Sequence, residues 1–95
     1  MKSVKITART ENGKIAIERA LHEGIKQDRR SRFLFKMLGY TQEIISREPF
    51  IVMVSLTKKV YQQIIKAQDI ANKIQEALTE NDAKKDTDYL IEVTE

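Results

Sequence analysis

A cluster of basic side chains in residues 26–36 is the feature whose residue types and spacing best fit a ligand. Asp28 is the only acid in these eleven residues. If the segment is helical, Arg29, Arg32 and Lys36 share one face and could contact successive phosphates of a nucleic-acid backbone. The predicted contact residues are Lys26, Arg29, Arg30, Arg32 and Lys36. The alternative is a solvated helix surface with apolar residues 33–35 packed behind it.

Side chains that could support catalysis or hold a metal are sparse. His22 is the only histidine, and no serine or carboxylate is expected beside it. Zinc-protease, nucleophile-elbow and phosphate-loop motifs are missing, and there is no cysteine to act as a thiolate or zinc ligand. Asp82, Asp86 and Asp88 lack the glycine and distal glutamate of a calcium loop, so we interpret their surroundings as a solvated loop. The sequence therefore predicts a protein that is not an enzyme and has no metal or cofactor.

Length and composition place the chain among small globular proteins. Its 95 residues fit a single domain, and 41% apolar with 33% charged residues is typical of a soluble fold. The absence of a membrane-spanning run or signal peptide predicts a cytoplasmic protein without a membrane partner. The net charge of +3 is uneven: residues 1–48 carry eleven basic against six acidic residues, and residues 49–95 carry six against eight. This polarity could steer an acidic partner or bring two copies together head to tail.

The hydrophobic pattern predicts the order strand, helix, strand, strand, helix, strand. Strict alternation marks a half-buried strand over 3–9, the apolar run FIVMVSL marks another over 50–56, and weaker patterns mark strands over 40–47 and 89–93. The longest helical pattern covers 57–78, and residues 80–87 form a polar loop. The apolar stripe of that helix consists of Val60, Ile64, Ala67, Ala71, Ile74 and Leu78.

Two alternatives stay open in the first half of the chain. Asn12-Gly13 is a hairpin signal, with a second strand following it. Alternatively, Thr10 or Asn12 caps a helix, which the persistent spacing of three and four favours. Residues 13–38 then form either one helix kinked near Asp28 or two helices, the second ending at Gly39.

This order is that of the ferredoxin-like, or split βαβ, arrangement. We therefore expect a single α+β domain over residues 1–95, built as a two-layer sandwich. Its four-stranded antiparallel sheet would have the first and third strands in the middle, and both helices would cover one face.

The apolar third strand predicts a surface for self-association. If Phe50 and the alternate residues after it face the helices, the side chains between them face the open side of the sheet. The predicted contact residues are Ile51, Met53 and Leu90, and Ile45 could join them. A second stripe on the 57–79 helix (Tyr61, Ile65 and Ile70) could also meet a partner helix. The open face lacks the aromatic platform of an RNA-recognition module.

Two functional hypotheses follow. The first is a small, non-enzymatic, homo-oligomeric binding module whose basic 26–36 segment contacts an acidic protein or a nucleic-acid backbone. The second is a structural or regulatory subunit whose open sheet face mediates self-association, subunit docking or the binding of a small ligand.

Overall fold

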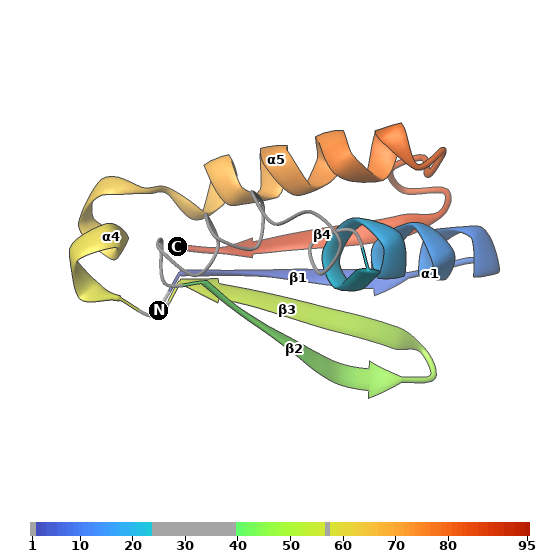
Figure 1. Ribbon diagram of the computed structural model, residues 1–95, viewed down its shortest axis with the longest axis horizontal. Helices are drawn as coiled ribbons and strands as arrows, with labels where there is room; N and C mark the ends of the chain where they lie inside the picture. Colours follow the sequence, from blue (N-terminus) through green and yellow to red (C-terminus); the bar gives the residue numbers. More distant parts are fainter. Residues whose placement is uncertain (1, 24–39, 57) are drawn as a thin grey trace.

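Four strands form one antiparallel sheet in the structure, a computed structural model that describes residues 2–23, 40–56 and 58–95 (Figure 1). The strands are β1 (Ser3–Ala8), β2 (Tyr40–Arg47), β3 (Phe50–Leu56) and β4 (Tyr89–Thr94). Their order in the sheet is β2-β3-β1-β4, so the first and third strands occupy the middle, as expected.

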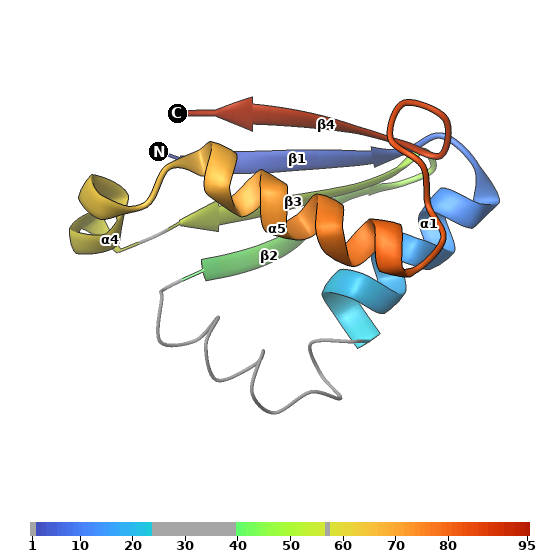
Figure 2. The same cartoon turned by 90° about the horizontal axis from the view of Figure 1, so that it is seen from above.

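The helices of the described chain follow β1 and β3. They are α1 (Glu11–Ile17), its π-helical continuation η1 (Glu18–Glu23), α4 (Lys59–Ile64) and α5 (Ala67–Glu80). Helix α5 crosses over the sheet, and α1 lies beside it on the same side (Figure 2). The described residues therefore form an α+β structure, a four-stranded antiparallel sheet with helices.

The core lies between this helical layer and one face of the sheet. In β3 the alternate residues Phe50, Val52, Val54 and Leu56 are buried, and the three between them are only partly buried. Val4 and Ile6 of β1 continue the same buried face. Ala83 of the loop and Tyr89 of β4 also belong to the core. The helices contribute the remaining core side chains, namely Ala16, Ile17, Leu21, Ala67, Ile70, Ala71, Ile74 and Leu78. The two-sided character predicted for residues 50–56 is confirmed.

Residues 11–17 are helical, so the hairpin alternative for Asn12-Gly13 is wrong. Thr10 is extended (φ −134°, ψ 166°), and its Oγ1 accepts a hydrogen bond from the N–H of Gly13 at 3.0 Å. A threonine side chain in this position satisfies a backbone donor that the first helical turn leaves unpaired. The cap therefore fixes where the helix begins.

The single helix predicted over 57–78 is interrupted. Lys66 is extended (φ −88°, ψ 144°) between α4 and α5, and the Nζ of Lys2 donates to the carbonyl of Ile65 at 2.8 Å. Helix α4 lies beyond the end of the sheet (Figure 1). Because no core lies beneath it, Val60 and Ile64 are 66% and 72% exposed.

The second stripe proposed for that helix is also wrong. Ile70 is buried at 3% exposure, and Ile65 packs partly against the core. The side chain of Tyr61 is not among those that the structure describes. Among the described apolar side chains of this region, Val60 and Ile64 are the ones left exposed, because the chain breaks between the two helices.

Candidate functional site

The open face of the sheet carries all three residues predicted for self-association. We use "open face" for the side of the sheet turned away from α1 and α5, which no described helix covers (Figures 1 and 2). Pairing of the strands arranges its side chains in three rows across the sheet. The rows are Ser46-Ile51-Thr7-Leu90, Glu43-Met53-Lys5-Glu92 and Thr41-Ser55-Ser3-Thr94.

Of the three apolar side chains, Ile51 and Met53 are neighbours on β3, whereas Leu90 lies two strands away on β4. Neighbouring strands are about 4.8 Å apart, so Ile51 and Leu90, with Thr7 between them, are separated by roughly 10 Å. Met53 belongs to the adjacent row on the same strand as Ile51. Leu90 is 38% exposed, and Ile51 and Met53 are partly exposed. The strands thus assemble a small apolar patch from residues far apart in the sequence.

Charges flank this patch in a regular way. Lys5 of β1 lies between its two cross-strand neighbours in this row, Met53 on β3 and Glu92 on β4. Glu43 follows at the β2 end of that row. These three rows therefore combine three apolar side chains with one positive side chain, near the centre, and two negative ones at the ends of the middle row. Such a mixture suits a protein surface, because opposite charges can fix the orientation of a docked partner.

A bulge changes the edge of the open face at β2. The pairing of β2 with β3 shifts between Ile44 and Ser46, which leaves Ile45 as the extra residue. Ile45 is 48% exposed. A bulge of this kind twists an edge strand and interrupts its ladder of hydrogen bonds.

The predicted basic site lies outside the described residues. This applies to all five of its members, Lys26, Arg29, Arg30, Arg32 and Lys36. The backbone of His22 belongs to η1, and its side chain is not among those described. Contact of the 26–36 segment with an acidic partner therefore stays a prediction from sequence.

Asp88 occupies a built polar site that the sequence reasoning missed. Its carboxylate accepts hydrogen bonds from the Thr10 hydroxyl at 2.8 Å, the Asn12 amide at 3.3 Å and the backbone N–H of Lys84 at 2.8 Å. Its side chain is 9% exposed, and Ala83 in the same loop is 3% exposed. The interpretation of residues 80–87 and Asp88 as uniformly solvated is therefore wrong at these two positions.

These hydrogen bonds lower the pKa of Asp88. The largest contribution is the N–H of Lys84, followed by the hydroxyl of Thr10; partial burial opposes them, and the Asn12 amide and the charge of Lys84 add to them. Each donor stabilises the ionised carboxylate. Because the lone pairs of Asp88 already serve the loop and the start of α1, we assign this carboxylate a structural role.

This polar junction joins the start of α1 to the loop that precedes β4. The sequence predicts Thr10 and Asn12 only as caps for α1, whereas both also bind that loop. Asn12 donates to the carbonyl of Asp82 at 3.0 Å as well. Two residues in the loop, Asp82 and Asp86, have positive φ values of 63° and 68°. Aspartate tolerates this conformation better than most residues, which is consistent with an Asp-rich turn.

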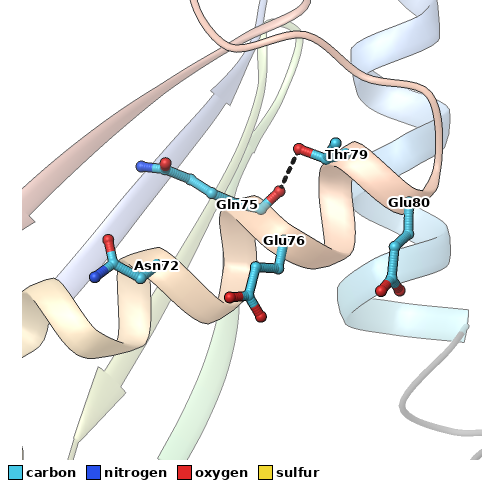
Figure 3. Close-up of a pocket in the computed structure, with 5 residues that line it drawn as sticks. All are labelled: Asn72, Gln75, Glu76, Thr79 and Glu80. Carbon is cyan, nitrogen blue, oxygen red and sulfur yellow. Dashed lines mark hydrogen bonds between the residues drawn. The ribbon is translucent and has the colours of Figure 1, made fainter.

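The described residues also line two shallow hollows away from the open face. One, of about 410 Å³, is lined entirely by α5, where the Oγ1 of Thr79 donates to the carbonyl of Gln75 at 2.8 Å (Figure 3). The other, of about 420 Å³, lies where β1 ends and β2 turns into β3. Its charged lining residues are Arg9, Glu11, Lys14, Arg47 and Glu48. The Nζ of Lys14 is 6.0 Å from the ring centre of Phe50.

Within the described ranges, no group of three or more histidine, aspartate or glutamate side chains is arranged to hold a metal ion. None of the helices described has both the length and the apolar character that crossing a bilayer requires.

Comparison with known proteins gave no relative: no protein-family model, curated protein or solved structure matches the chain.

Proposed function

We propose that this protein is a small, non-enzymatic interaction module that associates with a second copy of itself through the open face of its sheet. The observation that carries the proposal is the shared position of Ile51, Met53 and Leu90 on one face of the sheet that no described helix covers. A cluster of apolar side chains facing water is unfavourable, and covering it with another protein surface removes that cost.

The charge pattern favours a second copy as the partner. Lys5 lies in the same row as Glu43 and Glu92, so the face carries both signs of charge. A two-fold arrangement uses the same surface on both subunits, and such a surface must complement itself. A face that carries both signs of charge beside apolar side chains can meet that requirement, whereas a face of one sign would repel its copy.

We further propose that the domain belongs to the ferredoxin-like class of arrangements. The order of helices and strands and the strand order β2-β3-β1-β4 support this assignment. That class hosts many unrelated functions, so the functional proposal rests on the surface and not on the fold.

The test replaces Met53 with lysine. Two copies of Met53→Lys would replace apolar contact with two further charges that association would have to desolvate, and we expect the dissociation constant to rise at least about tenfold. The matched control is Val60→Lys, which makes a similar change on α4, where the side chain is 66% exposed and off the face. Sedimentation equilibrium measures the dissociation constants of both variants. Association that is unaffected by Met53→Lys would refute the proposal.

A further inference from the structure

The edge of the sheet formed by β4 offers a second binding surface, distinct from the open face. We infer that a second copy of this chain pairs antiparallel with β4 along this edge, which extends the sheet from one subunit into the next. This inference does not depend on the proposed function, because it concerns backbone groups at the edge and not side chains on the open face.

The hydrogen-bond pattern shows which backbone groups point outward from β4. The N–H of Arg9 donates to the carbonyl of Asp88 at 2.8 Å, and this pair continues the register of β1 with β4. In an antiparallel pair, every second residue directs its N–H and C=O to the neighbouring strand. Leu90, Glu92 and Thr94 therefore bond to β1, and the residues between them point the opposite way.

Two further contacts agree with this assignment. The carbonyl of Tyr89 accepts from the N–H of Asp86 in the loop, at 2.8 Å, and thus points away from β1. On the other side of β1, the N–H of Leu56 donates to the carbonyl of Lys2 at 3.0 Å. The even-numbered residues of β1 accordingly bond to β3 and the odd-numbered ones to β4. The backbone groups of Ile91 and Val93 are left directed outward.

This edge lacks most of the features that usually prevent pairing, and its one charged residue is Glu92. Over its six residues β4 keeps a regular register with β1, without a bulge, a proline or a lysine. The opposite edge, β2, is interrupted by the bulge at Ile45. Bulges, prolines and lysines are the common protections of edge strands. Figure 2 shows no described element along the outer side of β4 after the loop at its start.

An extended strand is the occupant that such an edge specifies, because its outward N–H and C=O groups need partners at strand spacing. β4 itself is such a strand, and a two-fold axis would let each copy satisfy the other. Ile91 and Val93 are only partly buried at this edge, so pairing would also cover their side chains.

Two constraints select the register of this pairing. The backbone of Tyr89, the first residue of β4, is already bridged to Lys85 of the loop and is therefore not free to pair with a second copy. A register centred on Glu92 would bring two glutamates directly opposite each other, which is destabilising. Centring the two-fold axis on Val93 avoids both conflicts and places Glu92 opposite Thr94 of the other copy.

Amide hydrogen exchange on the full chain tests the inference directly. At micromolar concentration, we expect the N–H groups of Ile91 and Val93 to exchange fast, because they have no strand partner. At millimolar concentration we expect their exchange to slow at least about tenfold, as the dimer forms. The amides of Leu90 and Glu92, which bond to β1, serve as internal controls and should be slow throughout. Exchange of Ile91 and Val93 that does not depend on concentration would overturn the inference.

A pair of variants separates the backbone from the side chain. Val93→Pro removes the outward N–H without removing a bond to β1, and we expect at least about tenfold weaker association. Val93→Ala keeps the N–H and should retain most of the association. Circular dichroism verifies that both variants fold. If Val93→Pro unfolds the domain, the exchange measurement decides by itself.

The two interfaces can fail independently. Loss of association in Met53→Lys, with no effect of Val93→Pro in a folded protein, would support the open face and refute the edge. The reverse result would refute the open face and support the edge. A third result concerns the amide exchange of Ile91 and Val93. If this exchange slows only when a synthetic extended peptide is added, and not as the protein concentration rises, the partner is a peptide and self-pairing is overturned.

Discussion

Gly13 lies directly against the backbone of Asp88, although 75 positions separate the two residues in the sequence. A Cβ atom added to Gly13 would lie 1.9 Å from the carbonyl oxygen of Asp88. That oxygen accepts the hydrogen bond from the N–H of Arg9 at 2.8 Å, so it is held in place by β1. The first turn of α1, the end of β1 and the start of β4 are thus packed together at one point where no side chain fits.

We expect Gly13→Ala to destabilise the domain. In a helix with open surroundings, alanine is more favourable than glycine by up to about 1 kcal/mol. Here the clash with the Asp88 carbonyl should dominate and lower the free energy of unfolding by about 2–3 kcal/mol. Urea denaturation measures the difference. Glu11→Ala, at an exposed position of the same helix, is the control, and a stabilised Gly13→Ala variant would show that the contact is not close.

The carboxylate of Asp88 makes stability depend on pH in the acid range. Its hydrogen bonds hold its pKa in the folded state below the ordinary value of 3.8. A lowered pKa means that the unfolded chain binds the proton more readily than the folded one. The stabilisation is therefore complete well above pH 3.8 and is lost as the pH falls through the lower pKa of the folded state.

Asp88→Asn should remove this dependence. The variant cannot accept all three hydrogen bonds, because its amide nitrogen would face donors from Thr10 or Lys84. We expect a lower melting temperature at pH 7, and a smaller difference between variant and native protein as the pH approaches 3. Asp86→Asn, at an exposed loop position, serves as the control. If the melting temperatures of the variant and the native protein differ by the same amount at every pH, this role of Asp88 is contradicted.

The sequence was sufficient to predict those parts of the fold that depend on hydrophobic periodicity. Residues 50–56 had to form a strand with two sides, and Ile51 and Met53 had to face away from Val52 and Val54. Periodicity could not reveal the break at Lys66, because the spacing of Val60 and Ile64 matches that of the buried positions on α5. Whether a helix position is buried depends on what lies beneath it, and the sheet ends before α4.

Hydrogen bonds between polar residues far apart in the chain could not be predicted from the sequence either. Nothing local distinguishes Asp88 from Asp82 or Asp86, since all three lie in the same charged stretch. Only the pairing of β1 with β4 brings Asp88 next to Thr10 and Asn12. The rows of the open face depend in the same way on strand register, which the sequence does not specify by itself.

The basic segment can be tested without reference to its conformation. If it contacts a nucleic-acid backbone, the affinity should fall with salt, with a slope of about 0.7–0.9 log units per phosphate neutralised. Arg29→Ala combined with Arg32→Ala should weaken binding and reduce that slope, while Lys58→Ala combined with Lys59→Ala provides a control of equal charge. Fluorescence anisotropy with a labelled single- or double-stranded oligonucleotide measures the slope. No binding of either nucleic acid at low salt would exclude this version of the function.

The break between α4 and α5 predicts opposite results for the same substitution at two isoleucines. Ile74 is 3% exposed within the core, so Ile74→Ala should lower the free energy of unfolding by about 2–5 kcal/mol through lost burial and an unfilled cavity. Ile64 is 72% exposed, and Ile64→Ala should change the free energy of unfolding by less than about 0.5 kcal/mol. Both changes remove the same atoms from helical positions, so intrinsic helix propensity largely cancels in the comparison. A comparable cost at both positions would mean that α4 packs on the core in line with α5, since only a covered Ile64 would lose that much on truncation.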